Sequence, residues 1–179
     1  MINFLDKSIL ITGASKGLGS VCAKALAENG ARLVLIARTE EKLEAVRMSL
    51  KNPERHFCIA ADLMDLQQLD AGIKRAKEFF KDIDVVLHVA GGGLGLRDIL
   101  LSAGDFIKLF TLNVAAAAEI NRIIVPEMIK RGKGNIVHIA SIASSEATAS
   151  VGYNTVKAAL AAYVRSLGRE IAGSGVVAT

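Results

Sequence analysis

Two side chains near the C-terminal end of the chain could act together on a proton. Tyr153 and Lys157 are four positions apart in a stretch expected to be helical, so both lie on one helix face. A phenol with a pKa of about 10 is a poor base near neutrality. A cation a few ångströms away stabilises the phenolate and lowers that pKa by roughly one to three units. The pair is therefore a candidate for general acid–base chemistry, although Tyr and Lys also share this spacing by chance on many helices.

Ser141 precedes this pair by one loop and directly follows an expected strand at residues 135–140. Open parallel sheets place ligands at this end of a strand. A serine nucleophile would need a nearby base, and the sequence contains no Gly-x-Ser-x-Gly turn. The three histidines, His56, His88 and His138, all lie within expected strands, where packed or edge positions are the simpler interpretation. The sequence does not support a serine hydrolase.

A glycine-rich turn separates the first expected strand from the first expected helix. Residues 12–19 read TGASKGLG, with Gly13, Gly17 and Gly19 in the spacing Gly-x3-Gly-x-Gly. Glycines allow a tight turn and a close approach of the backbone to a pyrophosphate, which then sits at the helix N-terminus. The alternative is a strand-to-helix turn that binds nothing. The position of the glycine turn at the carboxyl end of the first strand favours a dinucleotide site over this alternative.

The end of the second expected strand bears on the choice of nicotinamide cofactor. A carboxylate roughly 20 residues beyond the glycines binds the ribose 2′-hydroxyl of NAD, whereas an Arg there accommodates the 2′-phosphate of NADP. This chain has Arg38 at that position, with no carboxylate before Glu40, and Lys16 adds a second cation inside the glycine turn. Either cation alone could be an ordinary surface residue. Together they favour NADP(H).

The elements that position these residues alternate strictly between strand and helix. Strands are expected at residues 8–12, 32–37, 56–60, 84–89 and 135–140, with a sixth beginning at Val176. Helices are expected at residues 18–29, 40–50, 65–80, 104–130 and 153–172, with Thr39 capping the second, Asp65 and Gln68 forming a capping box, and Pro126 kinking or breaking the fourth. Continuous apolar strands with helical crossovers predict an α/β fold, a doubly wound parallel sheet of Rossmann type.

Composition and charge restrict the remaining function classes. The chain has 179 residues, is 51% hydrophobic and carries a net charge of +4, which suits one domain over residues 1–179 and excludes intrinsic disorder. The tight basic group of Lys130, Arg131 and Lys133 lies at an expected helix end, where cations complement the helix dipole. No aromatic residues interleave with it, so we expect no nucleic-acid partner. Cys22 and Cys58 are expected to be buried free thiols, and no metal-ligand spacing occurs.

We expect the protein to be cytoplasmic. No apolar run reaches the roughly 18 residues of a membrane span, so no membrane partner is expected. The segment before the first strand, residues 1–7, is too short and too polar for a signal sequence.

Taken together, residues 12–19, Asn113, Ser141 and Tyr153-x3-Lys157 resemble the short, non-extended branch of the short-chain dehydrogenase/reductase family. The resemblance covers essentially the whole chain, with the motifs in the family's order. It implies that Tyr153 exchanges a proton with the substrate oxygen as hydride moves to or from the nicotinamide. It also implies that Ser141 orients that oxygen, that Lys157 binds the nicotinamide ribose and lowers the pKa of Tyr153, and that Asn113 holds a water in a proton relay.

The same resemblance implies a set of cofactor contacts. Asp62 matches a position that contacts the adenine ring, with Leu63 beside it, while Ser15, Lys16 and Arg38 would form the 2′-phosphate site. The full set is Gly13, Ser15, Lys16, Gly17, Leu18, Gly19, Arg38, Asp62, Leu63, Ala90, Gly91, Tyr153 and Lys157. The implied protein is an NADP(H)-dependent oxidoreductase of a small-molecule ketone or secondary alcohol, assembled as a homodimer or homotetramer.

The chain departs from the family pattern in two places. The family's Asn-Asn-Ala-Gly after the fourth strand appears as His88-Val89-Ala90-Gly91, which puts local hydrogen bonding between strands in doubt. Glycines at 92, 93 and 95 then suggest a mobile loop at the active-site mouth. Family members continue beyond the position of Thr179 with further elements that cover the substrate, so the domain is expected to be C-terminally incomplete.

Two other functions stay open at this level. One is a dinucleotide-binding protein without turnover, acting as a redox sensor or scaffold. The other is a sugar-nucleotide epimerase or dehydratase of the extended branch, which is disfavoured because those glycine turns usually read Gly-x2-Gly-x2-Gly. Among reductases, the chain has the general look of ketoacyl-thioester, sugar and steroid alcohol enzymes, and its sequence does not choose among their substrates.

Overall fold

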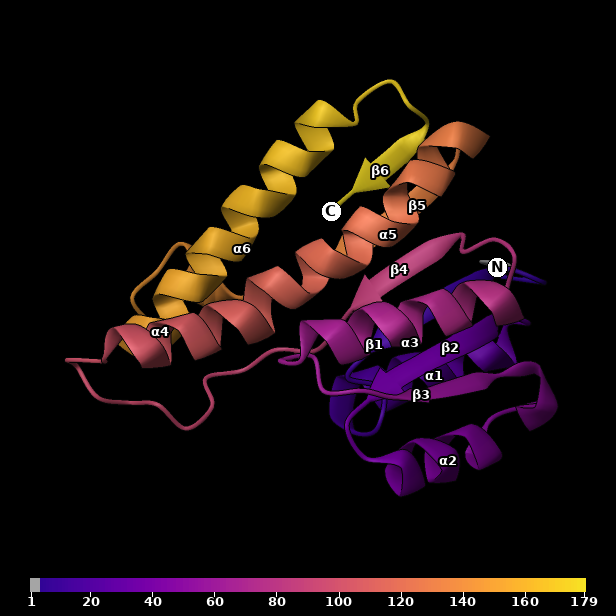
Figure 1. Ribbon diagram of the computed structural model, residues 1–179, viewed down its shortest axis with the longest axis horizontal. Coiled ribbons are helices and arrows are strands. Elements are labelled where there is room, and N and C mark those ends of the chain that lie inside the picture. Colours follow the sequence, from indigo (N-terminus) through magenta and orange to yellow (C-terminus); the bar gives the residue numbers. More distant parts are fainter. Residues whose placement is uncertain (1–3) are drawn as a thin grey trace.

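A computed structural model describes residues 4–179 and shows one parallel sheet covered by helices (Figure 1). Within these residues the strands are β1 (Ser8–Thr12), β2 (Arg32–Ala37), β3 (Phe57–Ala60), β4 (Val85–His88), β5 (Gly134–His138) and β6 (Val176–Ala178). Their order in the sheet is β3-β2-β1-β4-β5-β6, and all neighbours are parallel. This confirms the predicted doubly wound fold, whose strand order reverses between β1 and β4. The expectation for residues 1–7 falls partly on residues 1–3, which lie outside the described residues.

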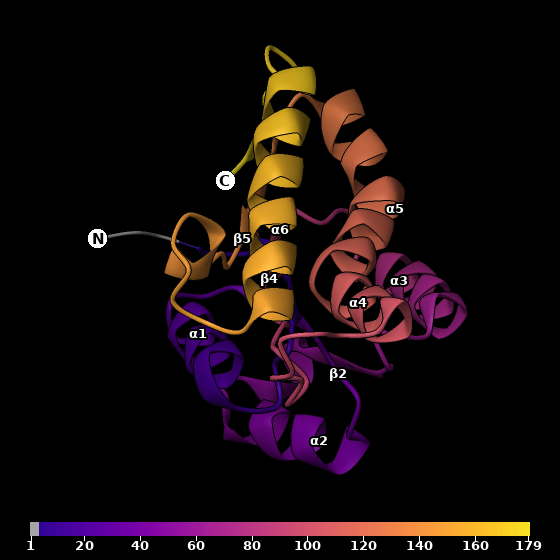
Figure 2. The same cartoon turned by 90° about the vertical axis from the view of Figure 1, so that its left-hand side faces the viewer.

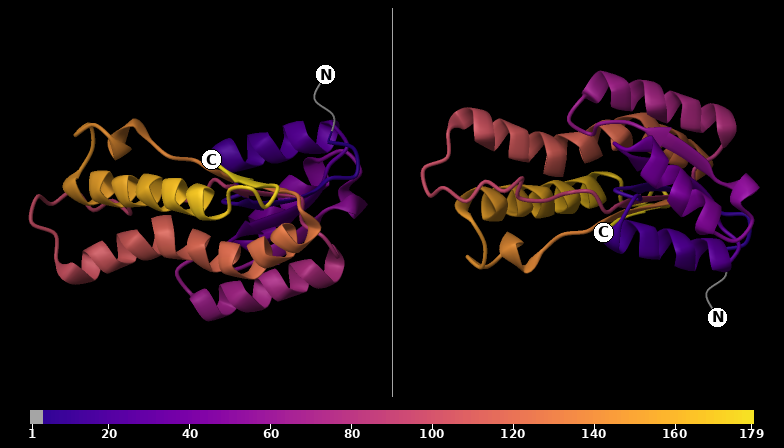
Figure 3. Two further views of the ribbon diagram at one scale, coloured as in Figure 1. Left: turned by 90° about the horizontal axis from the view of Figure 1, so that it is seen from above. Right: turned by 90° about the horizontal axis from the view of Figure 1, so that it is seen from below.

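The strands are apolar because both faces of the sheet are covered. Along β1 the fully buried side chains alternate: Ile9 and Ile11 join the core on one face, and Leu10 joins the core on the other. Helices α1 (Gly17–Glu28) and α2 (Glu40–Ser49) cover the first face. Helices α3 (Leu66–Phe79), α5 (Ala116–Arg131) and α6 (Val151–Glu170) cover the second. Figure 3 shows α1 and α3 on opposite sides of the sheet.

The predicted fourth helix is irregular, but not at the predicted residue. Helix α4 (Ala103–Phe110) passes through a π-helical turn, η2 (Thr111–Ala115), into α5, which continues through Pro126. The helix is therefore not broken at Pro126, a break being one of the two outcomes expected there. The side chain of Asn113 donates to the carbonyl of Leu109, 2.9 Å away, the acceptor that a regular helix would give to the backbone N–H of residue 113. Single π turns often mark functional sites.

The stretch Ala103–Arg131 is long and apolar enough to cross a membrane by length and composition alone. Half of its most apolar window is buried inside the protein. Ile120, Ile124 and Met128 of α5 belong to the core on one face of the sheet. Packing against the sheet therefore accounts for its apolar composition.

The remaining sequence expectations need small corrections. The third strand begins at Phe57 rather than His56, because a 3₁₀ turn, η1 (Pro53–Arg55), precedes it. His56 is buried, and its Nδ1 accepts from the backbone N–H of Leu33, 3.2 Å away.

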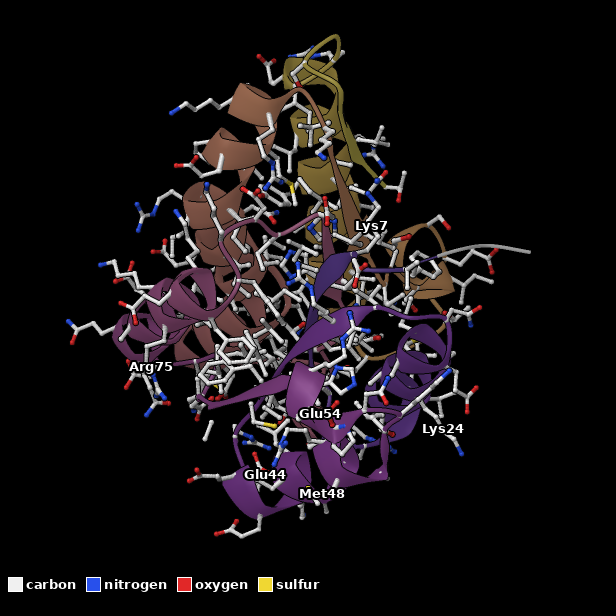
Figure 4. All side chains as sticks on the ribbon, turned by 90° about the vertical axis from the view of Figure 1, so that its right-hand side faces the viewer. Lys7, Lys24, Glu44, Met48, Glu54 and Arg75 are labelled. Atoms are coloured by element: carbon white, nitrogen blue, oxygen red, sulfur yellow. The ribbon has the colours of Figure 1, made fainter. Side chains whose placement is uncertain are left out.

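Both cysteines are free thiols but only half-buried. Burial raises the pKa of the Cys58 thiol to about 12, and Glu44 of α2 (Figure 4) hydrogen-bonds it. No cluster of possible metal ligands is found within residues 4–179.

Within residues 4–179, only one of the three basic side chains at the end of α5, that of Arg131, hydrogen-bonds or pairs with another segment. Arg131 donates to the carbonyl of Ile83, 2.6 Å away, and pairs with Asp82 at 2.6 Å. Gly132 ends the helix in the left-handed conformation, with φ of 68°. Arg131 therefore ties the helix end to the segment before β4, while Lys130 and Lys133 are exposed.

Two helix starts differ in a way that predicts a stability difference. Asp65 accepts from the backbone N–H groups of Gln67 and Gln68, 3.1 and 3.0 Å away, whereas Thr39 makes no side-chain capping bond within the described residues. The capping-box prediction is thus correct for Asp65 only, since Gln68 accepts from the N–H of Asp62 instead.

We expect Asp65→Ala to lower the free energy of unfolding by about 1 kcal/mol, because two helix donors lose their acceptor. The matched change Thr39→Ala should lower the free energy of unfolding by only about a few tenths of 1 kcal/mol, because no side-chain cap is lost. Urea unfolding of both variants measures the difference, and equal losses would contradict the assignment of the cap.

Candidate active site

The glycine turn brings the start of α1 against the end of β1. Gly13 and Gly17 have φ of 69° and 55°, a conformation that favours glycine. A Cβ at Gly19 would overlap the carbonyl oxygen of Gly13, and one at Gly13 would come within 3.0 Å of the Cα of Ala90. In the described part of the chain, Lys16 gives α1 no side-chain cap. The first N–H groups of α1 are therefore left for another acceptor.

A cavity of about 450 Å³ opens at this turn, along the carboxyl ends of β1 to β4. It is lined by eleven of the thirteen predicted cofactor residues, namely Gly13, Ser15, Lys16, Gly17, Leu18, Gly19, Arg38, Asp62, Leu63, Ala90 and Gly91. The other two, Tyr153 and Lys157, lie on α6 beyond its lining. Its size is ordinary for a site that holds a cofactor. The structure thus brings together residues from four separate strand ends.

The outer end of this cavity is positively charged. Lys16 and Arg38 line it from the ends of the glycine turn and β2, and Lys42 joins them from the first turn of α2. All three are exposed, and none forms an ion pair within residues 4–179. The uncapped start of α2 adds the positive end of a helix dipole. An anion at this end would meet three unpaired cations.

At the other end of the site, α6 carries the predicted catalytic pair. Lys157 is buried, and its Nζ lies 5.7 Å from the centre of the Tyr153 ring. Nζ donates to the carbonyl of Ile139, 2.9 Å away, just after β5. Burial lowers the pKa of Lys157. The prediction that Tyr153 and Lys157 share a helix face is confirmed.

Ser141 lies at the start of the 3₁₀ turn η3 (Ile142–Ser144), which packs against α6. Its Oγ accepts from the backbone N–H of Ala143, 3.2 Å away. A hydroxyl has one proton to donate, and this bond does not use it. Ser141 can therefore donate to a substrate oxygen.

Asn113 holds the loop that follows β4. Its Oδ1 accepts from the N–H of Gly92 at 3.0 Å, and its Nδ2 donates to the carbonyls of Gly92 and Leu109, each at 2.9 Å. A Cβ on Gly91 would lie 2.8 Å from Asn113 Oδ1 and 3.4 Å from Lys157 Nζ. The side chains of Asn113 and Lys157 therefore both lie close to Gly91. Both amide protons of Asn113 are used, so its side chain could only accept from a water.

The backbone after β4 is hydrogen-bonded although the motif there is altered. The hydroxyl of Thr12 accepts from the N–H groups of Val89 and Ala90, each 3.2 Å away. The carbonyl of His88 accepts from Ile139, 3.0 Å away. The loss of hydrogen bonding between strands that the sequence raised as a concern is therefore not seen.

A family model described as short chain dehydrogenase matches residues 7–179. This chain belongs to the short-chain dehydrogenase family. The Tyr153–Lys157 pair, Ser141, Asn113 and the glycine turn thus occur in a chain of that family, as their spacing suggested.

Three similar proteins illustrate the relationship. "Ketoacyl reductase HetN" of Nostoc sp. strain PCC 7120 is 32% identical over 178 residues, covering 98% of this chain and 62% of its own length. The crystal structure of L-sorbose reductase from Gluconobacter frateurii with NADPH and L-sorbose superposes with a TM-score of 0.90 at 30% identity, covering 97% of this chain and 67% of that one. A 7α-hydroxysteroid dehydrogenase with NADH and 7-oxo glycochenodeoxycholic acid gives a TM-score of 0.90 at 26% identity, covering 97% and 69%. The chain spans less than two thirds of the length of the ketoacyl reductase.

Sequence reasoning missed several residues that line the cavity. Lys42 carries the only charge among them, and the others are Ala37, Thr39, Ala61, Met64, Val89, Leu94 and Leu112. The available signals were the charge on Lys42 and its position in the first turn of the helix that follows Arg38. Apolar lining residues such as Leu112 give no such signal, because only the packed structure shows which side they face.

Proposed function

We propose that this short-chain dehydrogenase is an NADP(H)-dependent oxidoreductase of ketones and secondary alcohols. The observation that carries the proposal is the continuity between the two parts of the site. Ala90 and Gly91 line the cavity that begins at the glycine turn, and the side chains of Asn113 and Lys157 both lie close to Gly91. The names of the ketoacyl reductase and the sorbose reductase support the substrate class.

The cavity fits a dinucleotide. A Cβ at Gly13 would press on Ala90, and the uncapped N–H groups of α1 face a site where a pyrophosphate would bind. Ser15, Lys16, Arg38 and Lys42 would hold a 2′-phosphate, and Asp62 with Leu63 would contact the adenine. When bound, the nicotinamide supplies or accepts the hydride.

The chain's own groups would handle the proton and the oxygen. Tyr153 donates its phenolic proton to the substrate oxygen in reduction and removes the hydroxyl proton in the reverse direction. Lys157 would bind the nicotinamide ribose from the same helix face. Ser141 donates its free hydroxyl proton to the same oxygen and so orients it. Asn113 keeps the loop at Gly92 in place beside them.

The proposal predicts which cofactor binds more tightly. Titration with NADPH and NADH, followed by nicotinamide fluorescence, should show tighter binding of NADPH. In Arg38→Asp, NADPH should bind roughly ten- to a hundredfold more weakly, since a charge-assisted contact is replaced by repulsion. NADH should bind at least as well as before, because the new carboxylate can accept from a ribose hydroxyl.

Two lysines on neighbouring helices provide a matched test. Lys42 lines the cofactor cavity, whereas Lys24 on the outer surface of α1 (Figure 4) lines only the groove between α1 and α2. We expect Lys42→Ala to weaken NADPH binding a few-fold without affecting NADH, and Lys24→Ala to affect neither. Binding of neither cofactor by the unaltered protein would contradict the proposed function. Tighter binding of NADH would contradict the choice of cofactor.

A further inference from the structure

A buried polar cluster lies directly behind the proposed active site. His88 and His138 are paired in register at the ends of β4 and β5, and their rings stack with centres 4.5 Å apart. Asn121 of α5 bridges them: its Oδ1 lies 2.9 Å from Nε2 of His88, and its Nδ2 lies 3.3 Å from Nε2 of His138. Nδ2 also donates to the hydroxyl of Tyr163 on α6, 3.0 Å away. Asn121 and both histidines are less than a tenth exposed.

The amide of Asn121 dictates where the imidazole protons lie. Its oxygen can only accept and its nitrogen can only donate. His88 must therefore carry its proton on Nε2, and His138 must leave Nε2 bare and carry its proton on Nδ1. Nδ1 of His138 faces the carbonyl of Thr179, 3.4 Å away, which accepts that proton. One carboxamide thus selects two different neutral tautomers.

This cluster is joined to the catalytic lysine through β5. The carbonyl that receives Lys157 belongs to Ile139, the residue after His138. A cavity of about 10 Å³ lies between both histidines, Asn113 and Thr12. Burial lowers the pKa of His138, and the charge of Lys157 lowers it further. The groups that face the His138 ring are therefore His88 from β4, Asn121 from α5, Tyr163 and Lys157 from α6, and the Thr179 carbonyl after β6.

We propose that Asn121 is a positioning residue that keeps His138 and His88 in fixed neutral tautomers, so that Lys157 is the only cation in the interior behind Tyr153. A protonated His138 would add a second buried positive charge near the Lys157 ammonium, where charges repel more strongly than they do in bulk water. The two stacked rings could not both be charged for the same reason. Among residues 4–179, no Asp or Glu side chain hydrogen-bonds to this cluster, and the oxygen that faces Nδ1 of His138 is that of Thr179.

Imidazole nitrogen NMR of the unaltered protein tests the first half of the proposal. We expect a proton on Nε2 of His88 and on Nδ1 of His138, and no titration of either ring between about pH 5.5 and pH 8, the range in which an ordinary histidine titrates. A proton on Nε2 of His138, or an ordinary titration midpoint, would overturn the proposal. This measurement requires no variant, cofactor or turnover.

Asn121→Asp tests the link to Lys157. A carboxylate accepts from both rings and favours the charged imidazole, so we expect His138 to titrate within that range. The ¹³Cε resonance of Lys157 should then shift with the same midpoint. Asn135→Asp makes the same substitution at an exposed position on β5 and should produce neither change. If His138 titrates and the Lys157 resonance stays fixed, the coupling does not exist and the cluster has only a structural role.

A third experiment uses an uncharged substitution of Asn121, together with a measurement of turnover. Asn121→Ser removes the acceptor of His88, so the Nε2–H preference of His88 should be lost even if Asn121→Asp fails to fold, and an unchanged preference would count against the proposal. The effect on catalysis rests on the proposed function: Asn121→Asp should add one ionisation to the pH–rate profile at the midpoint of His138. Absence of turnover in the unaltered protein would count against the proposed function, while the NMR results would still decide the proposal about Asn121.

Discussion

Tyr153→Phe should reduce the rate of carbonyl reduction by roughly a hundred- to ten-thousandfold, the range typical for loss of a general acid. The substitution removes only the phenolic oxygen. We expect the ring to keep its place, because two of its neighbours lie against the ring and not the hydroxyl: a Cβ on Gly93 would lie 3.8 Å from Cδ2, and the ammonium of Lys157 lies 5.7 Å from the ring centre. NADPH affinity should therefore stay within a few-fold of the unaltered protein.

The measurement is single-turnover loss of nicotinamide absorbance with a ketone substrate, alongside a cofactor titration of the same sample. Thr155→Ala is the matched control, since it removes a hydroxyl from the same helix at an exposed position. Retention of more than a tenth of the rate in Tyr153→Phe would exclude Tyr153 as the acid. A loss of cofactor binding together with turnover would indicate a structural effect instead.

The features that the sequence predicted well are those with local causes. Strand β1 is recognisable because Ile9, Leu10 and Ile11 are successive apolar residues, as a strand covered on both faces requires. Gly13 and Gly17 mark a turn because their positive φ values exclude most other residues. Since parallel strands meet at one edge, Arg38, Asp62 and Gly91 could be assigned to one site from their positions after three strands.

The features that the sequence did not predict depend on contacts between distant segments. The π turn at η2 arises because one side chain, Asn113, takes the carbonyl of Leu109 and also clamps Gly92. Pro126 has the stronger local signal for a break, yet α5 continues through it. The partnership of Asn121 with His88 and His138 joins three elements at separations of 33 and 17 residues. Figure 2 shows α5 and α6 side by side, although β5 and a loop separate them along the chain.

We expect the histidine pair to make the protein sensitive to mild acid. Burial lowers the pKa of His88 to about 3 and that of His138 to about 4, from an ordinary value of about 6.5. Both pKa values are lower in the folded state, so the unfolded chain binds more protons below about pH 6.5. The stability that the neutral rings contribute is fully present above that pH and is lost as the pH falls toward 4. At about 1.36 kcal/mol per pKa unit, the loss for the two rings is on the order of several kcal/mol.

Because domains of this kind are stable by only about 5–15 kcal/mol, a loss of this size should bring the protein close to unfolding near pH 4. The pH range of this loss distinguishes the histidines from carboxylates, whose ordinary pKa values lie near 4. Between about pH 6.5 and pH 4.5 the free energy of unfolding, measured in urea, should therefore fall steeply in the unaltered protein. In a double variant with Asn at positions 88 and 138 it should fall much less, even if that variant is less stable at neutral pH. A level profile in the unaltered protein would mean that the rings can be protonated without leaving the folded state, and an unchanged slope in the double variant would place the acid sensitivity elsewhere.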